Sequence, residues 1–287
     1  MERKLIKAIQ WSSKHPGLLI YIIDQSHSMR EEYPELGNKA EFLAAVINRI
    51  IAEIILMNAA GAEVKDRAEI IIIGYGGEGG DSVTVMRSGM LSHYADHPLR
   101  MKKSMQKVAC GDRGLTEIEV ETPVFIEPLA KGSTATGKAF HLARGFAEKY
   151  VEAHPESPRI NIVHMTDGKP WSYELGHKEM EYAIEEVKRI MALNTLDGHP
   201  LVFNAHIGTG QPQYICPGDG TVLTDRQAQF LYEISSEIPE ELKMAAEKFE
   251  LGLERHARGF VSNASPDVFI KFINFGSSGG LVDRVSA

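Results

Sequence analysis

Residues 18–29 read LLIYIIDQSHSM, an apolar run that ends in one carboxylate and two hydroxyls, at Asp24, Ser26 and Ser28. The run is rich in isoleucine and follows a Pro-Gly step, which is typical of a strand buried on both faces of a sheet. Asp24 then stands at the carboxyl end of that strand, where open α/β sheets hold their ligands. Carboxylate and hydroxyl oxygens are hard ligands, so this stretch favours Mg²⁺, Ca²⁺ or Mn²⁺ over zinc.

Strand and helix patterns alternate along the rest of the chain. Residues 39–58 repeat apolar side chains with a helical period and predict a long helix with one buried face. Other predicted strands are 68–75, 82–87, 160–166, 201–208 and 257–263, and other predicted helices are 177–193, 226–251 (broken before Pro239) and 266–275. This alternation predicts an α/β fold, namely a three-layer, doubly wound, mostly parallel sheet with helices on both faces.

The domain organisation predicted from the sequence is simple. No shift in composition divides the chain, so residues 1–287 are predicted to form one domain with a core at about 17–275. Residues 88–131 show strand-like alternation only at Leu115 to Val120, and 44 residues are too many for a plain connection. We expect an elaborated loop there, over one end of the sheet, and a mobile tail at 276–287.

Composition excludes several classes of protein. The net charge is −8 and there is no basic stripe, so we expect no nucleic-acid partner. Cys110 and Cys216 lie far apart and outside any CxxC pair, which predicts neither a disulfide framework nor a thiolate zinc site. No stretch approaches the roughly 18 apolar residues of a membrane span, and the first residues lack a secretory signal. We therefore expect a cytoplasmic protein with no membrane partner.

Two later segments offer further oxygen ligands. The polar turn at 131–138 precedes a predicted helix, and either Thr134 or Thr136 can offer a hydroxyl there. We interpret Thr136 as the N-cap of that helix. Asp167 follows the strand predicted at 160–166. Because the carboxyl ends of parallel strands share one edge of a sheet, Asp24 and Asp167 converge if their strands are neighbours.

Together these segments resemble the metal-ion-dependent adhesion site of von Willebrand factor A domains. The matching motifs are D-x-S-x-S at 24–28, G-x-T at 132–134 and T-D-G at 166–168, in the family's order and after predicted strands. The resemblance covers about 17–85 and 130–275, and leaves out the 88–131 segment and the tail. It implies the Rossmann-like fold of that family, in its intracellular bacterial form.

In that family, Ser26, Ser28 and Thr134 would bind the metal directly, while Asp24 and Asp167 would act mainly through waters. One coordination position would stay open for a Glu or Asp carboxylate of a partner protein. The resemblance thus implies a binding module that uses Mg²⁺ (or Mn²⁺ or Ca²⁺), and not an enzyme. Intracellular relatives often work beside a separately encoded ATPase or kinase, which suggests a partner of that kind.

Three points stay open at this stage. His27 stands where relatives commonly have Gly, and its imidazole adds bulk or a charge that changes near pH 6.5. One alternative is a metal-dependent hydrolase or phosphatase that uses Asp24 and Asp167. Enzymes that transfer a phosphoryl group to an aspartate usually have a second acidic residue two positions later. In this chain Ser26 stands at that position after Asp24. Another alternative is a scaffold that keeps the fold without binding metal.

Other motifs are weaker. Residues 74–79 fit G-x-G-x-x-G, but a strand pattern follows where the dinucleotide fingerprint needs a helix, so we expect a flexible loop. Residues 132–139 approach a phosphate-binding loop, but Ala139 stands where a hydroxyl is needed. His93 and His97 have metal-ligand spacing without an intervening Glu, and are interpreted as surface histidines.

Overall fold

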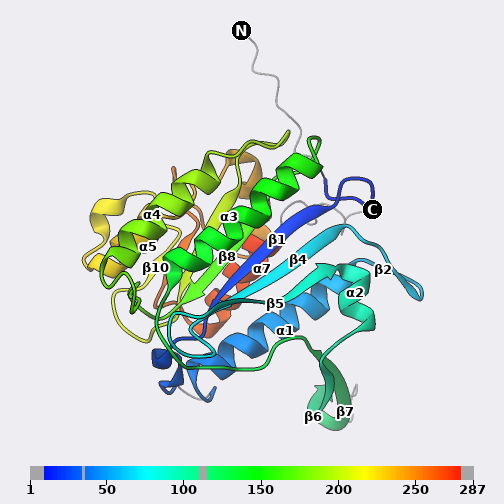
Figure 1. The fold of residues 1–287 in the computed structure, drawn as a ribbon. Coiled ribbons are helices and arrows are strands. Elements are labelled where there is room, and N and C mark those ends of the chain that lie inside the picture. Colours follow the sequence, from blue (N-terminus) through cyan, green and yellow to red (C-terminus); the bar gives the residue numbers. More distant parts are fainter. Residues whose placement is uncertain (1–9, 34–35, 110–114, 279–287) are drawn as a thin grey trace.

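A seven-stranded mixed sheet forms the centre of the molecule (Figure 1). The computed structural model describes residues 10–33, 36–109 and 115–278. The strand order is β10-β11-β9-β8-β1-β4-β5, in which neighbours are parallel except for the two edge pairs, β10-β11 and β4-β5. The strands are β1 (Gly17–Asp24), β4 (Ala68–Tyr75), β5 (Val83–Met90), β8 (Asn161–Thr166), β9 (Leu201–His206), β10 (Tyr214–Ile215) and β11 (Phe260–Ser262).

Helices cover both faces of this sheet (Figure 1). One hydrophobic core includes side chains of α1 (Lys39–Met57), α2 (Leu91–Asp96), α6 (Lys243–Lys248) and α7 (Pro266–Ser278). The other includes side chains of α3 (Thr136–Ala153), α4 (Lys178–Met191) and α5 (Arg226–Glu233). The predicted three-layer, doubly wound α/β architecture is therefore confirmed. The break predicted before Pro239 is present: residues 226–251 contain α5, which ends at Glu233, and α6, which follows a 3-10 turn at Glu240–Leu242.

Strand β1 shows why its sequence is so apolar. It pairs with β4 on one side and β8 on the other, and all of its residues are buried. Successive side chains of a strand point to opposite faces, so Leu19 and Tyr21 enter one core while Ile20 and Ile22 enter the other. Both faces of β1 are therefore covered by apolar side chains up to its last residue, Asp24.

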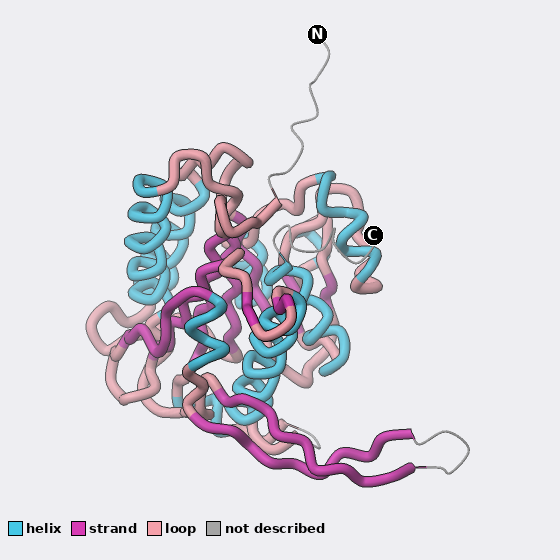
Figure 2. The backbone as a smooth tube through the Cα atoms, turned by 90° about the vertical axis from the view of Figure 1, so that its right-hand side faces the viewer, coloured by secondary structure: helices cyan, strands magenta, loops and turns pink. Residues whose placement is uncertain are grey.

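The segment at 88–131 differs from the predicted loop. It contains the end of β5, helix α2 and an antiparallel hairpin of β6 (Arg100–Ala109) and β7 (Leu115–Val124). Figure 2 shows this hairpin as a long arm that projects from the body of the molecule. Lys103 lies 2.9 Å from Glu119 and 3.4 Å from Glu121 across the hairpin. Strand β6 reads RMKKSMQKVA and lacks a regular apolar alternation, so the hydrophobic pattern did not reveal it.

The mobile tail was predicted to begin at residue 276, which still belongs to the last turn of α7. Residues 276–278 belong to α7, and residues 279–287 lie outside the described part of the chain. Two hydrogen bonds attach the end of α7 to the sheet. Asn161 Nδ2 of β8 donates to the Gly276 carbonyl (2.6 Å), and Tyr21 Oη of β1 donates to Ser277 Oγ (2.8 Å). A smaller antiparallel pair, β2 (Ala59–Ala60) and β3 (Glu63–Val64), follows α1.

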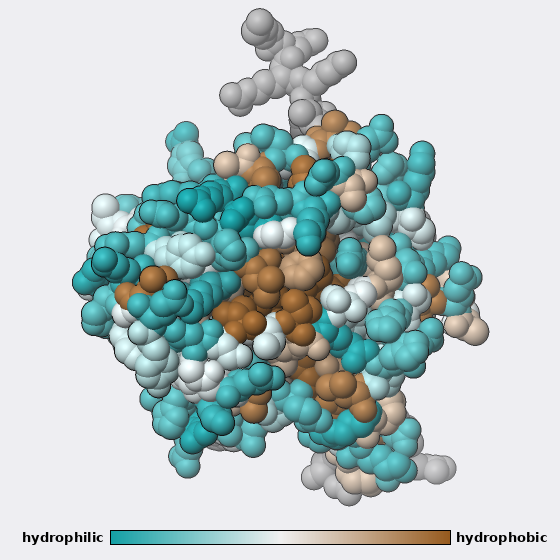
Figure 3. All heavy atoms as spheres, in the orientation of Figure 1, coloured by the Kyte–Doolittle hydropathy of each residue, from teal (hydrophilic) through white to brown (hydrophobic). Residues whose placement is uncertain are grey.

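The surface is uneven in its polarity. Hydrophobic residues gather on the face shown in Figure 3, between the positions of α3 and β5. Val85 of β5 is exposed. Within the described residues, no helix is long and apolar enough to cross a membrane. Cys216 is a buried free cysteine, and Cys110 lies outside the described residues.

Candidate functional site

The candidate site lies where the carboxyl ends of β1 and β8 meet. These strands are parallel neighbours, with Ile23 paired to Met165, so the residues that follow them lie side by side. After β1 the chain leads to α1 in one core, and after β8 it leads to α4 in the other. Such a switch point opens a crevice at the edge of the sheet, which is the usual ligand position in this type of fold. Asp24 and Asp167 were predicted to converge if their strands are neighbours, and β1 and β8 are neighbours.

Asp24 is buried at the carboxyl end of β1, with 1% of its surface exposed. Its Oδ1 accepts from the Ser26 amide (2.8 Å) and its Oδ2 accepts from Thr166 Oγ1 (2.6 Å). Burial, followed by the charge of Asp167, raises the pKa of Asp24 to about 6. Because both oxygens already have a donor, Asp24 is held in one orientation and does not project as a free nucleophile.

The two serines connect Asp24 to Asp167. Ser26 is extended and precedes a single 3-10 turn, His27–Arg30, which brings Ser28 back over Ser26. The two hydroxyl oxygens lie 3.1 Å apart, and Ser28 Oγ donates to Asp167 Oδ1 (2.6 Å). Local backbone geometry thus turns the D-x-S-x-S spacing into a cluster of oxygens.

Thr134 reaches the same cluster from the turn before α3. A Cβ placed on Gly168 would lie 3.3 Å from Thr134 Oγ1 and 3.6 Å from Ser28 Oγ, so both hydroxyls border the space that this glycine leaves. The Trp171 amide donates to the Thr134 carbonyl (3.0 Å), which ties the turn to the loop after β8. The prediction that Thr136 caps α3 is wrong, since Ala135 is the cap and the backbone at Thr136 is already helical.

The five predicted residues supply oxygen ligands only. Among the residues that the structure describes, no three His, Cys, Asp or Glu side chains gather where they could hold a metal ion. A cation at this site would therefore depend on the hydroxyls of Ser26, Ser28 and Thr134 beside two carboxylates. This donor set fits a hard ion such as Mg²⁺, which keeps several of its waters in protein sites.

Lys39 is a member of the site that the motifs did not reveal. Its Nζ lies 2.7 Å from Asp167 Oδ2 and 2.5 Å from Glu31 Oε2, and only 11% of its side chain is exposed. Burial lowers the pKa of Lys39, but the bonds to Asp167 and Glu31 outweigh it and raise the pKa above its ordinary value. The one sequence signal was a lysine at the first position of a helix, where the helix dipole disfavours a cation.

Asp81 is a second residue that the sequence analysis missed. Its Oδ1 accepts from Ser133 Oγ (2.6 Å) and the Tyr173 amide (2.7 Å), and its Oδ2 accepts from the Glu174 amide (3.0 Å) and Lys138 Nζ (3.4 Å). Burial raises the pKa of Asp81, but these donors outweigh it and hold the pKa below its ordinary value. Asp81 therefore joins the loop after β4, the Thr134 turn and the loop after β8.

The rim of the site carries exposed side chains. Trp171 and Tyr173 lie on the loop after β8 with 38% and 69% of their surfaces exposed, and their ring centres are 4.9 Å apart. Exposed His27 belongs to the 3-10 turn between the two serines. Aromatic side chains beside an open site are a common feature of protein interfaces.

The structure shows where two of the weaker motifs lie. Residues 74–79 lead from β4 through a turn into β5 and not into a helix. Gly76 has φ +87°, and a Cβ there would lie 2.5 Å from the Ser133 carbonyl, so this loop packs closely on the Thr134 turn. His93 and His97 are exposed and stack on each other, with ring centres 4.7 Å apart.

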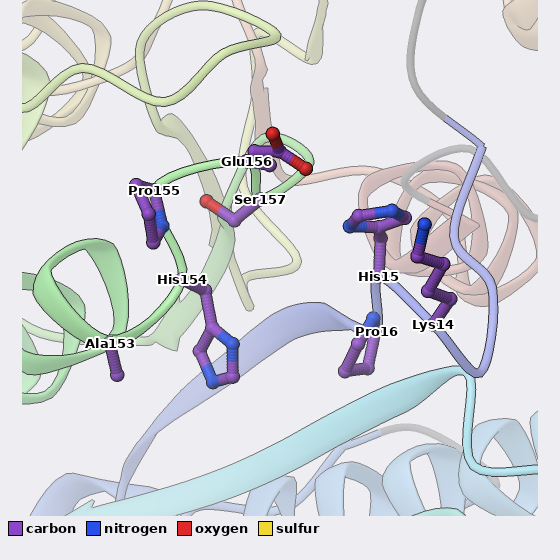
Figure 4. Close-up of a pocket in the computed structure, with 8 residues that line it drawn as sticks. All are labelled: Lys14, His15, Pro16, Ala153, His154, Pro155, Glu156 and Ser157. Carbon is purple, nitrogen blue, oxygen red and sulfur yellow. The ribbon is translucent and has the colours of Figure 1, made fainter.

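A pocket of about 270 Å³ lies near the other end of β1 (Figure 4). It is formed by the residues before that strand and by those after α3, among them His15, His154 and Ser157. None of the predicted site residues lines it. Ser157 Oγ is buried there without a hydrogen-bond partner in the described structure.

Comparisons with known proteins give only weak likenesses to solved structures. No protein-family model and no curated protein matches the chain. The vWF domain of the type V pili tip protein Mfa5 from Porphyromonas gingivalis is 15% identical, with a TM-score of 0.31, over 56% of this chain and 39% of that chain. Proximal thread matrix protein 1 from the mussel byssus is 13% identical, with a TM-score of 0.40, over 80% of this chain and 42% of that chain.

The chain thus spans less than half the length of either structure. At such identities and scores, the likeness adds no argument about function. The description of the fold rests on the strand order and the two cores.

Proposed function

We propose that this chain is a metal-dependent protein-interaction module. A divalent cation, Mg²⁺ or else Mn²⁺ or Ca²⁺, would bind to the hydroxyls of Ser26, Ser28 and Thr134. Asp24 and Asp167 would balance its charge, mainly through waters. The observation that carries the proposal is the meeting of these three hydroxyls and two carboxylates at the switch point of the sheet.

The partner would offer a Glu or Asp carboxylate. A metal held largely by neutral hydroxyls keeps most of its charge, and it would supply an electrophilic position for that carboxylate. The exposed rings of Trp171 and Tyr173 would form the adjoining contact surface. From the resemblance to intracellular A domains, we propose a separately encoded ATPase or kinase as the partner.

We propose binding rather than hydrolysis for a reason of geometry. Asp24 is buried, and each of its oxygens accepts a hydrogen bond, so it is poorly placed to attack a phosphoryl group. Turnover of a phosphomonoester by the purified protein, lost in Asp24→Asn, would contradict this choice.

The test of metal binding is the effect of Mg²⁺ on thermal unfolding. An ion that binds only the folded chain stabilises it by about 2.7 kcal/mol at a concentration 100 times Kd. For a chain of 287 residues, we expect Tm to rise by roughly 4–5 °C. Asp24→Ala and the milder Ser26→Ala should remove most of that rise in differential scanning calorimetry.

The matched control is Glu186→Gln. Glu186 is a buried carboxylate in α4 that pairs with Arg144 and Arg189, away from the site. This variant should be less stable than the wild type but should keep the full response to Mg²⁺. Equal responses in Asp24→Ala and in the wild type would refute the metal assignment. A pull-down with and without EDTA then identifies a partner that is retained only with metal.

A further inference from the structure

The candidate site already contains a cation of its own. Lys39 Nζ lies 2.7 Å from Asp167 Oδ2, while Ser28 Oγ occupies Oδ1 of the same carboxylate. The side chain of Asp167 has no exposed surface, and that of Lys39 has 11%. The ammonium is therefore directed at a residue of the candidate metal site and is largely withdrawn from water.

Glu31 gives this ammonium a second acceptor on the solvent side. Glu31 Oε2 lies 2.5 Å from Nζ, and 67% of the Glu31 side chain is exposed. Lys39 itself is fixed by its backbone at the start of α1, directly after the Asn38 cap. The ammonium can thus interact with Asp167 and Glu31 together, or mainly with Glu31, without any movement of the helix.

The charges of the site set the consequence. Inside the site, Asp24 and Asp167 contribute two negative charges and Lys39 contributes one positive charge before any metal arrives, while the third carboxylate, Glu31, is 67% exposed and is screened by water. An incoming divalent cation meets one uncompensated carboxylate and one nearby ammonium, and like charges repel strongly where water is scarce. A partner's carboxylate would add a negative charge to the site and so offset the positive charge of Lys39.

We propose that Lys39 is a tethered counter-ion that makes metal binding depend on the partner's carboxylate. The inference rests on the proposed function and extends it, because metal and carboxylate become cooperative ligands. Each then raises the affinity for the other by the same factor. Lys39 acts through Asp167 and the metal, so it is a positioning residue.

The test measures Mg²⁺ affinity by isothermal titration calorimetry, in sodium chloride and in sodium acetate of equal ionic strength. Acetate is the probe for a partner's carboxylate. The wild type should bind Mg²⁺ more tightly in acetate. Lys39→Met, which keeps the length of the side chain without its charge, should bind about tenfold more tightly in chloride and should lose most of the acetate effect. A tenfold change corresponds to about 1.4 kcal/mol.

Three further variants separate charge from structure. Lys39→Arg keeps the cation and should behave as the wild type. Lys271→Met removes a lysine that also pairs with two carboxylates, Glu250 and Asp267, far along the chain, and should change nothing. Glu31→Gln alters a side chain that is 67% exposed, so this variant should fold as the wild type does. In this variant Asp167 is the remaining carboxylate that pairs with the Lys39 ammonium. Because the ammonium then interacts more strongly with Asp167, the affinity for Mg²⁺ should fall.

The outcomes distinguish this inference from the proposed function. If the wild type binds Mg²⁺ and Lys39→Met binds equally or less tightly, the role of Lys39 is refuted while the metal site stands. If only Lys39→Met binds Mg²⁺ in either salt, a carboxylate does not restore binding in the wild type, so both the cooperative role of Lys39 and the proposed function of the wild type are refuted. If neither binds in either salt, both are refuted. If Lys39→Met does not fold, an unchanged affinity in Glu31→Gln refutes the role of Lys39.

Discussion

Acid should weaken the fold through one histidine beneath the candidate site. His164 lies in β8 with no exposed surface. Its Nδ1 lies 2.8 Å from Asn204 Oδ1, and its Nε2 lies 3.0 Å from Tyr75 Oη. The Asn204 oxygen can only accept, so Nδ1 carries the proton and Nε2 accepts from the tyrosine. This network satisfies the neutral imidazole, and a second proton on Nε2 would require the Tyr75 hydroxyl to stop donating to His164 and accept from it instead.

The expected magnitude follows from the pKa of His164. Burial lowers it from its ordinary value of 6.5 to about 4, against a smaller effect of the Asn204 bond. The unfolded chain therefore binds a proton at a higher pH than the folded chain does. Stability is intact above pH 6.5 and is lost as pH falls from 6.5 towards 4. Complete protonation would remove about 3 kcal/mol of unfolding free energy.

The assay is urea unfolding between pH 7.5 and 4.5 in EDTA. Asp24, whose pKa is raised to about 6, has the opposite effect, because the folded state takes up its proton first and gains stability as pH falls. The measured quantity is therefore the difference between the wild type and His164→Gln at each pH. His164→Gln should be less stable at pH 7.5, and this deficit should shrink by about 2–3 kcal/mol by pH 4.5. Exposed His177, changed to Gln, is the control.

A constant difference between wild type and His164→Gln across this range would refute the reasoning. It would mean that His164 has the same pKa in both states, and hence that the Tyr75–His164–Asn204 network does not exclude the proton.

Two further predictions concern the loops that hold Thr134. Gly76→Ala should cost about 1–3 kcal/mol and weaken Mg²⁺ binding, because its Cβ would lie 2.5 Å from the Ser133 carbonyl at φ +87°. Gly80→Ala, at φ +58° with open space, should cost only about 1 kcal/mol in urea unfolding, and equal costs would contradict the close packing. Asp81→Asn should lose about 1–3 kcal/mol and lower Mg²⁺ affinity in calorimetry, since one of its oxygens becomes a donor facing donors. An unchanged affinity would show that Thr134 is held without Asp81.

The candidate site was predictable where its residues are neighbours in the chain. Asp24, Ser26 and Ser28 form a cluster because a strand ends and a 3-10 turn follows, which is a local event. Asp167 was added by the rule that parallel strands end at one edge. Lys39 and Asp81 escaped prediction because their bonds to the other loops span 128 and 92 residues. Neither residue belongs to a motif.

The fold shows the same division. The long helix and the buried strands follow from apolar periodicity, since each element buries a face of its own. Alternation at 115–120 indicated part of β7, but β6 and its pairing with β7 were missed, because an arm that projects from the body has little buried face for a pattern to reveal. The end of α7 was missed because its order comes from bonds to Asn161 and Tyr21, which its own sequence does not contain.

The sequence by itself therefore determined the α/β class, the strand ends and the cluster of Asp24 and its two serines, because these depend on short-range periodicity and turns. Only the tertiary structure decided that β1 and β8 are neighbours, and that Lys39 lies against Asp167. Those contacts depend on how distant elements pack, and no local pattern encodes the distance between them.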